Sequence, residues 1–235
     1  MYLSRVEIDT RNRQKISDLS HLGAYHNWVE QSFPDEIRTG ERLRHLWRID
    51  QVESKKYLLL LSKDKPDLVK LERYGVAHTA ATKDYDQFLN SLVEGKRYRF
   101  RLTANPTHRI TNSKTNKSRV VPHITILQQV NWLLERMDKH GFKVLKDKSP
   151  HPYQIVKDGE VVEQKEYIYK LDVSSRDWPL LRRKENSRGM RLSRVTFEGF
   201  LEITDLEKFK NTLIKGIGRE KAYGMGLLTV MPLEN

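Results

Sequence analysis

The sequence of 235 residues contains no cysteine. This absence excludes disulfide bridges, thiolate metal sites and a cysteine nucleophile. The sequence also lacks an apolar run of about 18 residues, the length that marks a candidate membrane-spanning helix. Its first residues, MYLSRVEID, have neither the apolar core nor the cleavage site of a signal peptide. We therefore expect a soluble, intracellular protein that does not enter a membrane.

Negative charge is scarce relative to positive charge. Lysine and arginine together number 43, against 31 for aspartate and glutamate, so the formal net charge is +12 and the sequence pI is near 9.7. Such a balance favours a polyanionic partner over a small neutral ligand. Nucleic acid is the first candidate for that partner, and an anionic membrane surface is the competing one. The hydrophobic content of 37% indicates a globular chain with one large core or two small ones.

The familiar nucleotide-binding motifs are missing, although glycine is crowded near the end of the chain. The stretch KGIGREKAYGMGLLTV, residues 215–230, holds four of the twelve glycines. Lys221 stands where the dinucleotide motif needs its third glycine, and no Gly-Lys-Ser/Thr triplet occurs. A helix pattern precedes this stretch and a strand pattern follows it, the reverse of the order that directs a helix N-terminus at a phosphate. We expect no nucleotide cofactor.

Patterns that bind metals are also weak. The eight histidines are scattered, with no His-x-x-x-His pair on one helix face, so a zinc site has no support. The run Asp84-Tyr85-Asp86 is the nearest approach to a paired-carboxylate magnesium site, and such pairs are common at strand ends by chance. We expect no metal and no cofactor, and any catalysis to be metal-free.

The first part of the chain predicts one β-α-β-β-α-β unit. Apolar and polar residues alternate at the N-terminus as in a half-buried strand. A helix follows, with Leu19, Leu22, Val29 and Phe33 at helical spacing and Pro34 as its stop. The remaining elements are two strands around the turn Glu53-Ser54, a short amphipathic segment and a last extended run; they cover 43–52, 55–62, 66–74 and 77–85.

The same order is repeated in the rest of the chain. The apolar side chains of Leu127, Val130, Leu134 and Met137 predict a helix that ends at Gly141. A capping box over 204–207 opens a second helix, which Gly216 ends. The strands are expected at 97–102, 142–147, 194–203 and 224–233. The fold class is therefore α+β, with two tandem ferredoxin-like (RRM-like) domains over 1–90 and 94–235.

The segment from about 147 to 192 does not fit the repeat and is expected to be an insertion or an extended hairpin. The end of this segment and the residues just after it are basic. The cations are Arg182, Arg183, Lys184, Arg188, Arg191 and Arg194. A charge run of this kind is either a solvated loop or a contact for phosphates, and the overall charge favours phosphate contact.

His26 is the histidine whose position suggests chemistry. It lies on the apolar stripe of the first helix, one turn after Gly23. A histidine there is either a hydrogen-bonded core residue or a general acid or base. Gly23 favours the second interpretation, because it costs about 1 kcal/mol in a helix interior and leaves space beside the imidazole.

Several blocks of the sequence closely resemble the CasE family, the CRISPR-associated endoribonucleases of type I-E systems. They occur in order over nearly the whole chain and read MYLSRVEI, AYHNWVEQSFP, YRFRLTANPT, VTFEGFLEI and GIGREKAYGMGLLTVMPL. The glycine-rich block is similar to the hallmark loop of the wider Cas repeat-processing nucleases. The resemblance implies two ferredoxin-like domains and metal-free cleavage of precursor CRISPR RNA at the base of the repeat hairpin.

The resemblance also implies partners and products. The expected partners are the CRISPR RNA repeat hairpin, which stays bound after cleavage, and the other subunits of the Cascade complex. In isolation the protein is expected to be a monomer, in the prokaryotic cytoplasm. The expected products carry a 5′-hydroxyl and a 2′,3′-cyclic phosphate or 3′-phosphate. Two alternatives stay open, a module that binds the hairpin without cutting it and a structural subunit of a ribonucleoprotein.

The resemblance assigns the catalytic histidine to His26. A tyrosine often assists in the family three residues before it, where this sequence has Gly23. Tyr25 is the nearest phenol in the sequence; the alternatives are that a lysine or arginine takes this role or that it is absent. Arg183, Lys184 and Arg188 are the cations expected to stabilise the transition state.

The resemblance also gives the glycine-rich stretch a role in RNA binding. Gly216 and Gly218 allow unusual backbone angles, and Gly224 and Gly226 leave backbone N–H groups open to a phosphate. The cations of the same stretch are Lys215, Arg219 and Lys221. Without the resemblance, a glycine-rich turn before a strand is explained by packing about as often as by phosphate binding.

Overall fold

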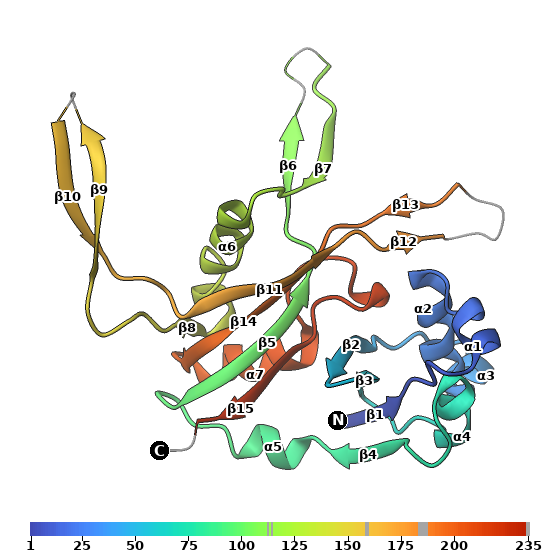
Figure 1. The fold of residues 1–235 in the computed structure, drawn as a ribbon. Helices are drawn as coiled ribbons and strands as arrows, with labels where there is room; N and C mark the ends of the chain where they lie inside the picture. Colours follow the sequence, from blue (N-terminus) through green and yellow to red (C-terminus); the bar gives the residue numbers. More distant parts are fainter. Residues whose placement is uncertain (112, 114, 158–159, 183–187, 234–235) are drawn as a thin grey trace.

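The structure is a computed structural model that describes residues 1–111, 113, 115–157, 160–182 and 188–233. It consists of two antiparallel sheets with helices packed against them, and three hairpins extend from this body (Figure 1). This arrangement confirms the predicted α+β class and the tandem ferredoxin-like order.

The N-terminal sheet has the strand order β2-β3-β1-β4. Its strands are β1 Tyr2–Glu7, β2 Leu46–Val52, β3 Lys55–Ser62 and β4 Ala81–Asp84. The helices are α1 Arg13–Asp18, α2 Leu22–Gln31, α3 Pro34–Thr39, α4 Leu68–Leu71, the 3₁₀ turn η1 Glu72–Tyr74 and α5 Asp86–Asn90. The predicted β-α-β-β-α-β order is therefore present, with α2 between the first two strands.

The C-terminal sheet has the order β11-β14-β5-β15, and β8 pairs with the far end of β14. Its strands are β5 Arg97–Ala104, β8 Phe142–Val144, β11 Leu171–Asp177, β14 Arg194–Ile203 and β15 Leu228–Pro232. The helices are α6 Ile126–Leu134, η2 Asp138–His140, α7 Leu206–Lys215 and η3 Lys221–Tyr223. Because β8 and β11 both pair with β14, together they take the place of the second strand of the repeat.

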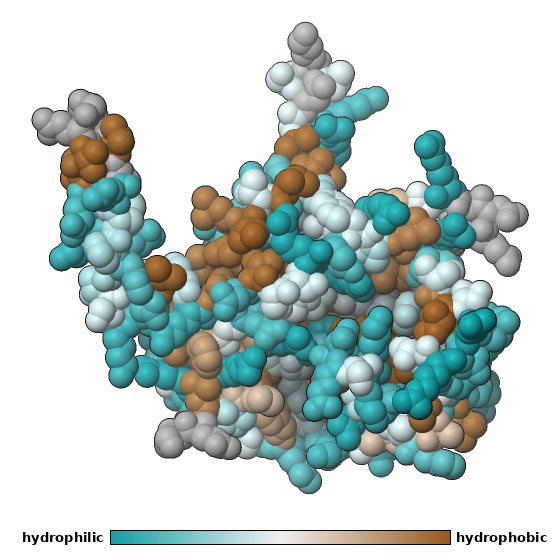
Figure 2. Space-filling view, in the orientation of Figure 1, coloured by the Kyte–Doolittle hydropathy of each residue, from teal (hydrophilic) through white to brown (hydrophobic). Residues whose placement is uncertain are grey.

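The three hairpins are connected to the C-terminal sheet. They are formed by β6 Thr107–Thr111 with β7 Ser118–Pro122, β9 His151–Lys157 with β10 Glu160–Glu166, and β12 Leu180–Leu181 with β13 Met190–Arg191. Figure 2 shows hydrophobic residues on the β9–β10 hairpin and over α6, on a face that is otherwise largely hydrophilic. The β12–β13 hairpin reaches toward α2 of the N-terminal half (Figure 1).

The structure differs from the sequence-based expectations at several elements. The expected insertion at 147–192 contains β11, which belongs to the sheet, and the β6–β7 hairpin was not expected. Pro34 does not simply stop the first helix, since it is the first residue of α3, where its missing N–H costs nothing. The second helix of the C-terminal repeat is capped by Asp205 instead of Thr204. The Asp205 carboxylate accepts a hydrogen bond from the backbone N–H of Lys208.

The helix that was expected to end at Gly141 is shorter and turns a different face to the core. α6 ends at Leu134, and a separate 3₁₀ turn leads to Gly141, whose φ of 73° provides the left-handed end. The buried residues of α6 are Gln129, Trp132 and Leu133, whereas Leu127 is 69% exposed. The periodicity therefore located the helix but misplaced its buried stripe.

Strand β2 joins the two halves of the molecule. The Arg48 side chain is 3% exposed and forms a two-bonded pair with Asp50 at 2.6 and 2.8 Å. Its remaining N–H groups donate to the carbonyl oxygens of Arg101 and Leu227 and to the Thr229 hydroxyl, at 2.9–3.1 Å. These last three partners lie on β5 and on or just before β15, so one guanidinium connects the N-terminal sheet to the C-terminal sheet.

Candidate active site

His26 lies on α2 at the edge of a cavity of about 570 Å³. The helix is fixed by the residues on its other face, where Trp28 and Val29 are buried and the Trp28 indole N–H donates to the carbonyl of Leu71 at 3.0 Å. Residues 26 and 30 are one turn apart, so His26 and Glu30 both line this cavity. The imidazole is 34% exposed, which leaves it accessible to a ligand. We call this space the His26 cavity.

The other walls of the His26 cavity come from two loops. Arg42 and Arg44 lie in the segment before β2 and are exposed. The second is the glycine-rich loop, residues 215–226, which contributes Arg219, Lys221 and Tyr223. The cavity is also lined by His45 and by the carboxylates Glu30 and Glu220. Its four lysine and arginine side chains outnumber these two carboxylates, which suits an anionic ligand.

Tyr223 is the phenol that meets His26. The two rings meet in a T-shaped arrangement, with ring centroids 5.4 Å apart and the planes at 69°. Sequence reasoning did not select Tyr223, because the contact joins α2 to a loop near the other end of the chain. The signal available was its position inside the glycine-rich stretch, YGMG, already singled out for its glycines.

Tyr25 does not share the cavity of His26. Its ring stacks on Trp47 at 5.9 Å, and it lines a separate cavity together with Leu22 and Arg194. Burial raises the pKa of the Tyr25 phenol above its ordinary value. The structure thus places the two expected catalytic residues on different sides of α2, as expected for adjacent residues on a helix.

Gly23 allows the chain that follows strand β12 to pack closely against helix α2. A Cβ at this position would collide with the carbonyl oxygen of Arg182 and lie 2.9 Å from the His21 ring. The space left by the missing side chain is therefore already filled by the hairpin, which differs from the expectation that it lies free beside the imidazole. A tyrosine at this position would displace the hairpin.

The four glycines of the glycine-rich loop all have positive φ, between 70° and 94°. Three of them, Gly216, Gly224 and Gly226, are buried. A Cβ at Gly224 would lie 2.5 Å from the Trp47 ring, and one at Gly226 would lie 2.9 Å from the carbonyl oxygen of Ile217. These glycines shape and pack the loop, so the expectation that phosphate approaches at Gly224 and Gly226 does not fit this structure. Gly218 is exposed.

The Lys221 side chain is held by hydrogen bonds within the glycine-rich loop. Its ammonium donates to the carbonyl oxygens of Lys215 and Gly216 at 2.6 and 2.8 Å, and so provides partners for carbonyl groups at the C-terminal end of α7. Burial lowers the pKa of Lys221. Lys215 and Arg219 are exposed, so their charges remain available to a ligand.

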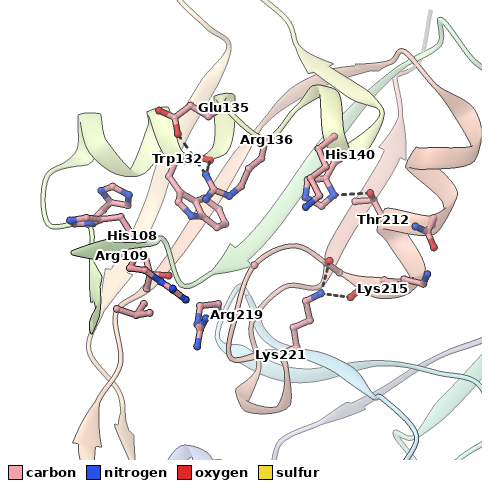
Figure 3. Close-up of a pocket in the computed structure, with 17 residues that line it drawn as sticks. His108, Arg109, Trp132, Glu135, Arg136, His140, Thr212, Lys215, Arg219 and Lys221 are labelled. Carbon is pink, nitrogen blue, oxygen red and sulfur yellow. Dashed lines mark hydrogen bonds and ion pairs between the residues drawn. The ribbon is translucent and has the colours of Figure 1, made fainter. Parts of the chain in front are cut away.

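A second cavity of about 770 Å³ lies on the other side of the glycine-rich loop (Figure 3). It shares Gly218, Arg219 and Lys221 with the His26 cavity. Its cationic residues are Arg109, Arg136, Lys139, Lys215, Arg219 and Lys221. Glu135 is the one acidic residue among those that line it. The two cavities adjoin at these shared loop residues, and we call them together the basic groove.

Local contacts set the charge of this second cavity. The Arg136 guanidinium donates to the carbonyl of Trp132 at 2.7 Å and lies 4.5 Å from the centre of the Trp132 ring. His140 hydrogen-bonds the Thr212 hydroxyl at 2.9 Å, and burial lowers the pKa of His140 to about 4. His140 is therefore neutral at pH 7, and the positive charge of the groove comes from its arginines and lysines.

The basic segment expected from the sequence lies elsewhere. Arg183 and Lys184 fall outside the described residues. Arg191 donates to the carbonyl of Trp178, and Arg194 pairs with both oxygens of Asp177. Arg182, Arg188, Arg191 and Arg194 are described, and neither cavity of the basic groove is lined by any of them.

The described residues hold no group of three or more histidine, aspartate or glutamate side chains placed to bind a metal ion. Within the same part of the chain, every helix is too short or too polar to cross a lipid bilayer.

Comparison with known proteins gives matches over nearly the whole chain. A family model described as CRISPR associated protein matches residues 1–232. The CRISPR-associated endoribonuclease Cse3 of Thermus thermophilus is 28% identical over 236 residues, with 99% of this chain and 100% of that protein covered.

Solved structures of CRISPR-associated proteins also match nearly the whole chain. A Cse3 endoribonuclease bound to a 19-nucleotide RNA superposes with a TM-score of 0.76 at 26% identity, covering 99% of this chain and 100% of that one. Thermus thermophilus Cse3 bound to an RNA that represents a pre-cleavage complex gives 0.72 at 27%, with 98% of each chain covered. Cas6e from Escherichia coli gives 0.61 at 24%, with coverage of 99% and 100%, and so shares the fold. The chain belongs to the CRISPR-associated protein family whose model spans its residues 1–232.

Proposed function

We propose that this protein is an endoribonuclease that cleaves precursor CRISPR RNA at the base of the repeat hairpin. The observation that carries the proposal is the partly exposed imidazole of His26 in a cavity lined by cations. The full-length similarity to a protein named as an endoribonuclease, and to its RNA complexes, supports the same function.

The basic groove is the proposed path of the RNA. The glycine-rich loop separates its two cavities, and exposed Arg219 borders both. Figure 3 shows Arg109 of β6 and Arg219 of the loop facing the same space. A strand that crosses the loop would have phosphates near cations on both sides, with the scissile phosphate in the His26 cavity.

The proposed reaction uses the nucleophile that RNA itself carries. The 2′-hydroxyl attacks the adjacent phosphorus, the bond to the 5′-oxygen breaks, and the products are a 2′,3′-cyclic phosphate, or the 3′-phosphate formed by its hydrolysis, and a 5′-hydroxyl. The protein has to hold these groups in line and assist proton transfer. His26 either takes the 2′-hydroxyl proton or protonates the leaving oxygen, while Arg42, Arg44 and Arg219 are placed to stabilise charge on the phosphate.

Metal independence, product retention and residence in the Cascade complex are parts of the proposal that rest on the resemblance of the sequence blocks to the CasE family. Tyr25 has no role in it, because its ring lies away from the His26 cavity. Tyr223 instead packs against the imidazole.

The proposal is tested by incubating the purified protein with a synthetic repeat hairpin in EDTA and analysing the ends of the products. We expect cleavage without metal, 5′-ends that polynucleotide kinase labels directly, and 3′-ends blocked by a phosphate. Activity that requires added divalent metal, or products with 5′-phosphates, would contradict the proposed chemistry.

A second candidate function is binding of the hairpin without cleavage. The observation that favours it is Gly23, at the position where the family often has a tyrosine. Tight binding of the intact hairpin, with no product after prolonged incubation in the same experiment, would support this alternative.

A further inference from the structure

Glu30 stands between two histidines. Its Oε1 lies 3.8 Å from Nδ1 of His26 and 3.4 Å from Nδ1 of His45. The first distance is within the range of an ion pair and longer than a hydrogen bond. Catalytic hydrogen bonds are often long before substrate binds, and a small rotation of either side chain would close this one.

His45 fixes Glu30 from the protein interior. The side chain of His45 is 1% exposed and stacks on Phe33 at 3.9 Å with the ring planes at 6°. Its Nε2 lies 3.1 Å from Oε1 of Glu36, whose other carboxylate oxygen accepts from the backbone N–H of Leu43 at 3.3 Å. Each ring nitrogen of His45 therefore faces a carboxylate oxygen, one from Glu30 and one from Glu36. The row His26, Glu30, His45 and Glu36 alternates imidazoles and carboxylates.

The surroundings keep Glu30 ionised. Burial by itself raises the pKa of Glu30, but the hydrogen bond from His45 and the charges of His26, His45 and Arg42 outweigh burial and hold this pKa below its usual value. The other charged or titratable groups that line the cavity are Arg44, Arg219, Glu220, Lys221 and Tyr223. Glu220 therefore offers a second carboxylate in the same cavity, and among the described residues it forms no ion pair or hydrogen bond with His26.

We propose that Glu30 is the positioning residue of His26: its carboxylate accepts a hydrogen bond from Nδ1–H and thereby turns the unprotonated Nε2 toward the RNA. This proposal rests on the proposed endoribonuclease function and adds the group that selects the tautomer and orientation of the imidazole. Glu30 touches neither the substrate nor the reacting atoms. The buried pair of His45 and Glu36 holds the carboxylate in place.

The first test compares Glu30→Gln with the matched variant Glu220→Gln. Both substitutions remove one negative charge from the same cavity, so their difference isolates the contacts that Glu30 makes with His26 and His45. We expect Glu30→Gln to lower the single-turnover cleavage rate at saturating protein by about tenfold or more beyond the effect of Glu220→Gln. The affinity for a non-cleavable hairpin is expected to change to the same small extent in both variants.

The second test determines which ring nitrogen of His26 carries the proton in the protein without RNA. Nitrogen-15 NMR spectra, recorded at a pH where the ring is neutral, distinguish a proton on Nδ1 from a proton on Nε2. We expect the Nδ1–H tautomer of His26 in the unmodified protein and in Glu220→Gln, and a loss of this preference in Glu30→Gln. Thermal unfolding of the variants shows whether each is folded.

The outcomes separate the two proposals. Equal rates for the two variants together with an unchanged tautomer in Glu30→Gln would overturn the role of Glu30. If the unmodified protein shows the Nδ1–H tautomer but does not cleave the hairpin, the proposed function fails while the Glu30–His26 contact stands. A lowered rate and a changed tautomer in a folded Glu30→Gln protein would support both.

Discussion

Replacement of His26 by alanine is expected to slow single-turnover cleavage of the repeat hairpin by about 10²- to 10⁴-fold, the usual contribution of a general acid or base. The affinity for the hairpin is expected to stay within a few-fold, because the cations of the basic groove remain. Alanine is a good helix former, and the imidazole is 34% exposed, so α2 should keep its structure. Rapid-quench kinetics and filter binding with the same RNA measure the two quantities.

A matched control for this variant is His151→Ala. This histidine lies on the β9–β10 hairpin, is 53% exposed and contacts Asp147. It lines neither cavity of the basic groove, so its loss should change neither rate nor affinity. A His26→Ala protein that cleaves within about tenfold of the unmodified protein would show that His26 is not the proton-transfer group.

Arg48→Ala is expected to lower the free energy of unfolding by about 3 kcal/mol, because it removes a buried guanidinium and leaves Asp50 with only its longer ion pair to Arg101 at 3.4 Å. The lost contacts also include the hydrogen bonds to the carbonyl oxygens of Arg101 and Leu227, which join the two sheets. We expect a large decrease in the urea midpoint. The same strand carries Trp47, whose indole N–H donates to Ala222 in the glycine-rich loop at 3.0 Å, so loosening β2 should also disturb the His26 cavity.

Arg99→Ala provides the comparison for Arg48→Ala. Arg99 is 58% exposed and pairs with Glu198 at 3.2 Å, and exposed pairs of this kind contribute about 0–1 kcal/mol. If the two variants unfold at similar urea concentrations, the buried guanidinium is not what joins the sheets.

The regular elements could be predicted because their local patterns agree with their surroundings. Strand β14 alternates buried and partly buried residues along its whole length, and α7 buries Phe209, Thr212 and Leu213 on one face below an aspartate cap. These periods follow from the geometry of strand and helix alone. The repeat of six elements, and with it the fold class, was therefore visible in the sequence.

The packing between distant segments could not be predicted in the same way. The contact of Tyr223 with His26 depends on how the glycine-rich loop packs on Trp47, which no local period encodes. Buried Gly224 and Gly226 look the same in the sequence as glycines that are open to a phosphate. Gly23 likewise gave no sign that it accommodates the carbonyl of Arg182.

The charge of the sequence indicated a polyanion but did not show which cations line the His26 cavity. The expectation named the run near 182–194 and the cations of the glycine-rich stretch; of these, Arg219 and Lys221 line the cavity, beside Arg42 and Arg44, which were not singled out. These residues are separated along the chain and become neighbours through the fold. The charge run is easier to see in the sequence than a cluster assembled from several loops.

The central claim is that this protein uses the 2′-hydroxyl of its RNA as the nucleophile. The most direct measurement compares two repeat hairpins in EDTA, one all-ribose and one with a single 2′-deoxy nucleotide at the cleavage site, at equal and saturating protein. We predict cleavage of the first, and binding of the second with the same affinity but no cleavage. Cleavage of the deoxy-substituted hairpin at the same bond would contradict the claim, because another nucleophile would then be attacking the phosphate.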